Sequence, residues 1–171
     1  MKDLTIAFIG AGNMARSLVS GLIAAGADAG RIRASDPDAA QRERLAALGI
    51  VAVDTNDQAI AGADVVVLAV KPQVLGSVLP ALPIAAGQLV VSIAAGVPLE
   101  ALERWTPPGT AIVRCMPNTP ALLGAGVTGM FANAAVTPAQ RDSADAVLAS
   151  AGRTVWVDDE DLLDAVTAVS G

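Results

Sequence analysis

The chain has 171 residues, of which 53% are hydrophobic and 16% charged, and its formal net charge is −6. This length suffices for one α/β domain with a buried core, and an acidic balance without a basic stripe argues against binding to nucleic acid or to an anionic membrane surface. The sequence contains no histidine, no tyrosine and one cysteine, which excludes an imidazole or phenol as a proton donor, an intrachain disulfide and a thiolate zinc site.

The first elements alternate between strand and helix. A short apolar run predicts a strand at residues 5–9, and apolar positions at helical spacing predict a helix at residues 13–25. A second strand is expected at residues 31–35. It leads into a helix for which Asp36 is the expected N-cap and Gly49 the expected stop.

The middle of the chain continues this alternation. We expect a strand at residues 51–53 and then a short helix capped by Asn56. The continuous apolar run at residues 64–70 is typical of a parallel strand that is buried on both faces. A helix at residues 73–79 and another buried strand at residues 88–96 follow.

The remaining elements complete the pattern. A helix is expected at residues 99–105, strands at residues 110–116 and 126–132, a helix at residues 137–149 and a last strand at residues 153–157. Regular alternation of strands and helices predicts an α/β fold. Its architecture is expected to be a doubly wound, mostly parallel Rossmann-type sheet with helices on both faces.

We expect residues 1–158 to form one dinucleotide-binding domain. Residues 159–171 place apolar side chains at helical spacing and predict the start of a further, helical domain whose remainder lies beyond this sequence. The apolar run at residues 4–11 ends in a glycine-rich turn rather than a cleavage site, and prolines interrupt the uncharged stretch at residues 72–99. The sequence therefore indicates a cytoplasmic protein that does not span a membrane.

The stretch "FIGAGNMA" contains the spacing G-x-G-x-x-A at Gly10, Gly12 and Ala15. Gly10 permits the tight turn after the strand, Gly12 lets a pyrophosphate approach the backbone, and Ala15 lets the helix lie on the strand. The following helix would present its N–H groups to the phosphates. A dinucleotide site is the favoured interpretation, because the motif follows a strand and opens a helix. A purely structural turn is the alternative.

The end of the second predicted strand carries the residues that usually distinguish NAD from NADP. An acidic side chain there binds the ribose hydroxyls of NAD, whereas a cation suits the 2′-phosphate of NADP. Asp36 favours NAD, but it is equally expected to be a helix cap. Ser35 and the nearby Arg42 offer an alternative site for a phosphate.

Other strand ends should meet at the same edge of the sheet, where ligands of open α/β sheets bind. Asn56 is expected to cap its helix and also to donate to a ribose. Lys71 is interpreted either as a solvated surface lysine or as a partner for a phosphate or carboxylate. The loop "MPNTP" places Asn118 and Thr119 between two prolines, and such a stiff polar loop at a strand end is typical of a binding site.

Five motifs resemble those of pyrroline-5-carboxylate reductase, in the same order and at similar spacing over the whole chain. They are "FIGAGNMA", "AVKPQ", "SIAAG", "VRCMPNTPA" and "DAVTAVSG". The combination is specific, although each motif alone is short or common. The resemblance implies an oxidoreductase that reduces 1-pyrroline-5-carboxylate to L-proline, the last step of proline biosynthesis. The family uses NADPH and often, less well, NADH.

The resemblance implies particular site residues. The cofactor contacts that it implies are Ile9, Gly10, Ala11, Gly12, Asn13, Met14, Ser35, Asp36, Asn56, Val70, Lys71 and Ala95. The loop that it places beside the nicotinamide and the substrate comprises Met116, Pro117, Asn118, Thr119 and Pro120. It implies no catalytic side chain and no metal ligand within this chain. Asp36 differs from the basic or neutral residues common at its position in members that prefer NADPH.

The family resemblance also implies a homo-oligomer, formed through a helical domain that supplies most of the substrate pocket. These residues alone are then expected to bind NADP(H), with NAD(H) as a second cofactor, and to be nearly inactive toward the small-molecule substrate. Two alternatives stay open. One is a stand-alone NADP(H)-binding module without catalysis, and the other is a different Rossmann-type dehydrogenase.

Overall fold

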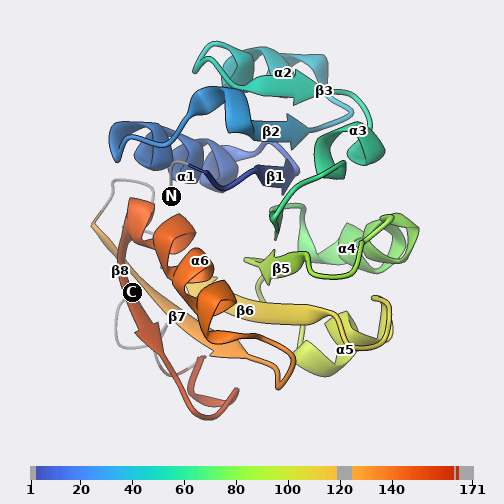
Figure 1. The fold of residues 1–171 in the computed structure, drawn as a ribbon, viewed down its shortest axis with the longest axis vertical. Coiled ribbons are helices and arrows are strands. Elements are labelled where there is room, and N and C mark those ends of the chain that lie inside the picture. The colour runs from blue at the N-terminus through green and yellow to red at the C-terminus, as the bar shows by residue number, and fades with distance from the viewer. Residues whose placement is uncertain (1–2, 119–124, 164, 166–171) are drawn as a thin grey trace.

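The computed structural model describes residues 3–118, 125–163 and 165. Its strands form one eight-stranded sheet in the order β3-β2-β1-β4-β5-β6-β7-β8 (Figure 1). The strands are β1 (Ile6–Ile9), β2 (Ile32–Ser35), β3 (Val51–Val53), β4 (Val65–Leu68), β5 (Leu89–Ser92), β6 (Ala111–Pro117), β7 (Gly126–Ala132) and β8 (Gly152–Trp156). This order, with β1 and β4 adjacent at the centre, confirms the predicted doubly wound fold.

Neighbouring strands are parallel except for one pair, β6 with β7. β6 ends at Pro117 and β7 begins at Gly126. A parallel crossover needs a connection of about a dozen residues or more, usually with a helix, whereas antiparallel strands need only a short one. The short connection therefore explains why the sheet is mostly, and not wholly, parallel.

Helices cover both faces of the sheet. The helices are α1 (Asn13–Ala24), α2 (Ala39–Ala46), α3 (Asn56–Ile60), α4 (Pro72–Val78), α5 (Leu99–Arg104) and α6 (Pro138–Leu148), with 3-10 turns η1 (Ala29–Arg31), η2 (Leu79–Ala81) and η4 (Ala149–Ala151). Buried residues of α1, α2 and α6 belong to one core cluster, and those of α3, α4 and α5 belong to a second. The sheet separates these two clusters.

β1 shows how the sequence produces two cores. Side chains alternate between the faces of a strand, so Ile6 and Phe8 join the first cluster while Ala7 and Ile9 join the second. All four residues are at most 1% exposed. A central strand that is buried on both faces is uniformly apolar, which is why the run could be recognised in the sequence.

The predicted start of α2 is wrong. Its N-cap is Asp38, whose Oδ1 accepts a hydrogen bond from the backbone N–H of Ala40 at 2.9 Å, and the helix begins at Ala39. Asp36 instead turns its carboxylate toward the glycine-rich loop, where Oδ2 accepts from the N–H of Ala11 at 2.9 Å. Two aspartates lie close together before this helix, and the competing contact with a distant loop decides which of them becomes the cap.

The predicted cap of α3 is also one residue late. Thr55 is the N-cap and Asn56 is the first helical residue. The Asn56 side chain accepts from the Ser35 hydroxyl instead of capping its helix. For α6 the prediction is confirmed, because Thr137 and Gln140 form a reciprocal capping box and a proline occupies the first turn.

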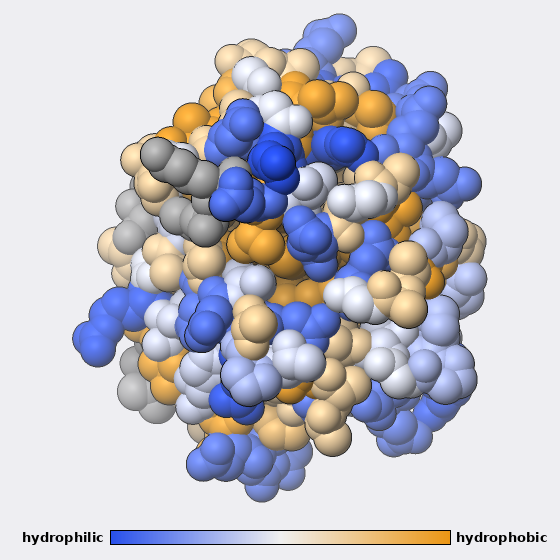
Figure 2. Space-filling view, in the orientation of Figure 1, coloured by the Kyte–Doolittle hydropathy of each residue, from blue (hydrophilic) through white to orange (hydrophobic). Residues whose placement is uncertain are grey.

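The end of the chain is described only in part. Leu162, Leu163 and Ala165 are helical, whereas residues 164 and 166–171 lie outside the described residues. The division into a domain at residues 1–158 and a second at residues 159–171 stays a prediction. No helix in the described ranges is long and apolar enough to cross a membrane. On the face seen in Figure 2, hydrophilic residues are interspersed with apolar ones over the described part of the chain.

Candidate functional site

The carboxyl ends of β1 to β4 meet at one edge of the sheet and enclose an open cleft of about 480 Å³. The residues that line it are Gly10, Ser35, Asp36, Pro37, Asp54, Thr55, Asn56, Val70, Val74 and Val78. Five of these, Gly10, Ser35, Asp36, Asn56 and Val70, are among the contacts predicted from the sequence. The order of the sheet reverses between β1 and β4, and open α/β sheets bind ligands at such a reversal.

Gly10 lies where β1 turns toward α1, and it must be glycine. Its φ of +100° is a conformation that other residues rarely adopt. A Cβ atom at this position would lie 2.8 Å from the carbonyl oxygen of Ala69. The backbone N–H of Gly10 also donates to the carbonyl of Ser35 at 2.9 Å. Gly10 therefore lets the strand ends of β1, β2 and β4 come together.

Gly12 has a different environment. It is the N-cap residue of α1 and has no side chain with which to cap the helix. A Cβ atom here would meet no protein atom within 4 Å, so the fold itself does not require glycine at this position. The first turn of α1 contains no acidic residue, which leaves its N–H groups and the positive end of the helix dipole available for an anion. A pyrophosphate fits this donor set.

The other loop residues lie around these two glycines. Ile9 and Ala11 bury their side chains and present only backbone groups, whereas Asn13 is exposed and Met14 half-buried in the first turn of α1. Ala15 is 1% exposed in the core, as expected for a small residue that allows close packing between α1 and β1. Their predicted contacts with a cofactor stay predictions.

Asp36 is one of the polar residues that line the cleft. Its Oδ2 accepts from the N–H of Ala11 and its Oδ1 from the N–H of Asp38, each at 2.9 Å. These two bonds fix the carboxylate in one orientation between the glycine-rich loop and the start of α2. Each oxygen retains a further lone pair for a hydroxyl donor.

Ser35 and Asn56 form a pair between β2 and α3. The hydroxyl of Ser35 is fully buried and donates to Oδ1 of Asn56 at 2.7 Å. Because the amide oxygen is engaged, the NH₂ group of Asn56 remains as the donor that this half-buried side chain can offer to the cleft. The structure thus brings two predicted residues together, with Ser35 orienting Asn56.

On the apolar side of the cleft only Val70 was among the predicted contacts. Val70, Val74 and Val78 recur every four residues from the end of β4 along α4, and Pro37 lies in the lining with them. Val74 is 43% exposed, which is unusual for a large aliphatic side chain on a helix that packs on a sheet. A row of valines at this spacing offers a flat apolar wall, of the kind that packs against an aromatic ring. This repeat was visible in the sequence.

Several predicted residues do not line the cleft. Lys71 is the exposed N-cap residue of α4, and Ala95 is exposed in the loop after β5. Met116 and Pro117 are half-buried at the end of β6. Asn118 is 5% exposed, and its Oδ1 accepts from the N–H of Val127 at 2.9 Å, which fixes it to β7. Thr119 and Pro120 lie outside the described residues.

A partly buried ion pair links three segments of the chain. Nη1 of Arg114, in β6, lies 2.7 Å from Oε1 of Glu160, which follows β8. The same oxygen accepts from the N–H of Leu99 at the start of α5, also at 2.7 Å. The side chains are 8% and 26% exposed, respectively. Neither residue was predicted to matter, and their separation of 46 positions left no local signal.

Cys115 is buried in the first core cluster. Burial raises the pKa of its thiol far above the ordinary range, and the charge of Asp145 raises it further. We expect the native chain to react with a thiol reagent orders of magnitude more slowly than the chain unfolded in urea, because only the thiolate is nucleophilic. Raising the pH above the ordinary thiol pKa of about 8.5 should favour unfolding, since only the unfolded thiol then ionises. Equal labelling rates for the native chain and for the chain unfolded in urea would contradict the expected protection of the buried thiol.

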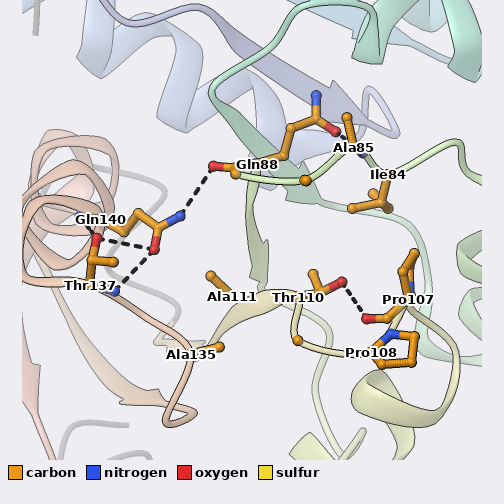
Figure 3. A pocket seen from close by; sticks show the side chains of 13 residues that line it. Ile84, Ala85, Gln88, Pro107, Pro108, Thr110, Ala111, Ala135, Thr137 and Gln140 are labelled. Atoms are coloured by element: carbon orange, nitrogen blue, oxygen red, sulfur yellow. Dashed lines mark hydrogen bonds between the residues drawn. The ribbon is translucent and has the colours of Figure 1, made fainter.

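A second cavity lies at the opposite edge of the sheet, ahead of β5 and β6, with a volume of about 310 Å³ (Figure 3). Its polar side chains bond to the protein itself: Gln140 to Thr137 and to the carbonyl of Gly87, and Gln88 to the N–H of Ala85. The amino ends of parallel strands are not where α/β sheets bind ligands. Among the described residues, no group of three or more His, Cys, Asp and Glu could hold a metal ion.

Comparison with known proteins places the chain among oxidoreductases. Residues 5–96 match the family model described as NADP oxidoreductase, coenzyme F420-dependent. The whole chain is 54% identical over 174 aligned positions to 64% of the pyrroline-5-carboxylate reductase of Pseudomonas aeruginosa. The resemblance inferred from the five motifs is thereby confirmed. The chain spans about 64% of the length of the curated relatives that it matches.

Solved structures agree with this assignment. A pyrroline-5-carboxylate reductase from Coxiella burnetii matches with a TM-score of 0.89 at 39% identity, over 98% of this chain and 64% of that one. The pyrroline carboxylate reductase of Plasmodium falciparum, solved with NADP bound, matches with a TM-score of 0.86 at 27% identity, over 100% of this chain and 63% of that one.

Proposed function

Because the chain belongs to the family described as NADP oxidoreductase, coenzyme F420-dependent, we propose that it is the cofactor-binding part of a pyrroline-5-carboxylate reductase. The reaction is hydride transfer from a nicotinamide dinucleotide, NADP(H) or NAD(H), to the imine carbon of 1-pyrroline-5-carboxylate, which yields L-proline. The observation that carries the proposal is the cleft at the carboxyl ends of the central strands, whose lining residue Gly10 leads through Gly12 into the uncapped N-terminus of α1.

We assign the contacts by the chemistry of each part of the cofactor. The N–H groups at the start of α1 bind the pyrophosphate, and the close approach of the phosphates uses the missing side chain of Gly12. Asp36 and Asn56 bind the adenosine ribose. The valine wall of α4 packs against the adenine ring.

The nicotinamide end is assigned to the ends of β5 and β6. Ala95, in the loop after β5, offers a small side chain beside which a flat ring can lie, and the predicted loop at residues 116–120 begins with the last two residues of β6. When bound, the reduced nicotinamide supplies the hydride that a cyclic imine requires. The chain contributes mainly position, because holding the imine carbon against the ring lowers the barrier without a catalytic side chain.

The rest of the relatives' length is proposed to complete the enzyme. We assign to it most of the substrate pocket and the contacts of a homo-oligomer, in a cytoplasmic protein. These residues alone are then expected to bind cofactor but to turn over little substrate. The alternatives that remain, a binding module without catalysis and a different dehydrogenase, are separated by the experiment that follows.

The experiment combines calorimetric titration with an activity assay. The 171-residue chain is titrated with NADPH and with NADH, and oxidation of each reduced dinucleotide is then followed with 1-pyrroline-5-carboxylate. As the control, reduction of NADP+ and of NAD+ is followed with a 3-hydroxyacid. Micromolar binding with slow oxidation that depends on the imine supports the proposal. Binding without any oxidation favours the binding module. Reduction of a dinucleotide that depends on the 3-hydroxyacid, or no binding of either dinucleotide, overturns the proposal.

A further inference from the structure

We propose that the ribose end of the cleft selects a free 2′-hydroxyl, so that this chain binds NADH more tightly than NADPH. The inference rests on the proposed function, since it assumes that a nicotinamide dinucleotide occupies the cleft. NADH and NADPH differ at the adenosine ribose, where NADPH carries a phosphate on the 2′-oxygen and NADH carries a free hydroxyl.

The first observation is the fixed carboxylate of Asp36. Two backbone N–H groups, those of Ala11 and Asp38, hold its two oxygens at 2.9 Å. The carboxylate therefore cannot turn away from an incoming ribose without losing both bonds. It is well placed to accept hydrogen bonds from ribose hydroxyls, and it repels a 2′-phosphate.

The second observation is the charge of the whole lining. Asp54, at the end of β3, lies in the cleft together with Asp36, and the lining within the described residues contains neither lysine nor arginine. A phosphate monoester carries about −1.5 to −2 charges at pH 7. Placing that charge beside two carboxylates is unfavourable, and the NH₂ group of Asn56 is only one neutral donor.

The third observation concerns the two residues that could have received a phosphate. Ser35 is fully buried and donates its hydroxyl proton to Asn56. Nη1 of Arg42 donates to the carbonyls of Asp36 and Pro37, at 2.7 and 2.9 Å, and Arg42 does not line the cleft. The Ser35 hydroxyl and Nη1 of Arg42 are thus engaged within the loop after β2 and α3, which favours the NAD interpretation of this strand end over the NADP interpretation.

The test compares dissociation constants for NADH and NADPH by calorimetry, for the native chain and for variants. We expect the native chain to bind NADH at least about tenfold more tightly than NADPH. A tenfold difference in dissociation constant corresponds to one modest unfavourable charge contact. Asp54→Asn removes one charge from an exposed position of the lining and should narrow the ratio severalfold, chiefly by improving NADPH binding. Asp36→Ser should narrow the ratio of the two dissociation constants further. It should also weaken the binding of NADH, because the carboxylate that accepts from the ribose hydroxyls is lost.

The matched control is Asp142→Asn, which changes the net charge equally at an exposed position of α6. It should leave the ratio of the two dissociation constants unchanged. Equal or tighter binding of NADPH by the native chain overturns the inference while the proposed function stands. A ratio that responds to Asp142→Asn as much as to Asp54→Asn also overturns it. If neither dinucleotide binds, both the inference and the proposed function fail.

Discussion

Replacing Gly12 with alanine is expected to lower the affinity for a nicotinamide dinucleotide by about tenfold or more while leaving thermal unfolding unchanged. The added methyl group meets no protein atom within 4 Å, so the fold has room for it. A bound pyrophosphate leaves no room for the methyl group, because the proposed position of the phosphates requires close approach to this backbone. Calorimetric titration measures the loss of affinity, and a thermal melt of the same sample measures stability.

Gly10→Ala is the matched comparison, because it adds the same methyl group two residues earlier. Here the methyl lies 2.8 Å from the carbonyl oxygen of Ala69, and φ is +100°. Backbone strain and overpacking together should cost about 2–4 kcal/mol of unfolding free energy, and affinity should fall as well. If Gly12→Ala binds cofactor like the native chain, the glycine-rich loop is a structural turn only.

Much of the fold was predictable because its signals are local. The apolar run that became β4 is buried at all four positions, and a continuous apolar run is the local signal of a central strand covered on both faces. The Thr-Pro pair at the start of α6 is a cap that acts within one helical turn. Physical causes that act over a few residues leave a readable pattern in the sequence.

The details of the cleft were less predictable, because partners distant in sequence compete for the same groups. Asp36 stands at a sequence position typical of an N-cap. Its carboxylate instead accepts a hydrogen bond from the glycine-rich loop, 25 residues away. Asn56 likewise bonds to Ser35 across 21 positions instead of capping α3. Local propensity predicts which side chains form hydrogen bonds, whereas the partner of each side chain depends on the tertiary fold.

Glu160→Ala is expected to lower the free energy of unfolding by about 2–3 kcal/mol. The substitution deprives the buried guanidinium of Arg114 and the N–H of Leu99 of the oxygen that both contact at 2.7 Å. Breaking a buried ion pair typically costs about 3–5 kcal/mol, and the 26% exposure of Glu160 reduces this cost. The midpoint of urea unfolding, at an unchanged m-value, measures the effect.

An exposed ion pair with the same N–O distance provides the control. Arg104 and Glu100 also lie 2.7 Å apart, but their side chains are 68% and 83% exposed, and they are neighbours on one helix. Glu100→Ala should therefore cost no more than about 0.5 kcal/mol. Equal costs for the two variants would contradict the assignment of a structural role to Glu160. A large difference would show that burial, and not the length of the contact, makes this ion pair hold β6, α5 and the segment after β8 together.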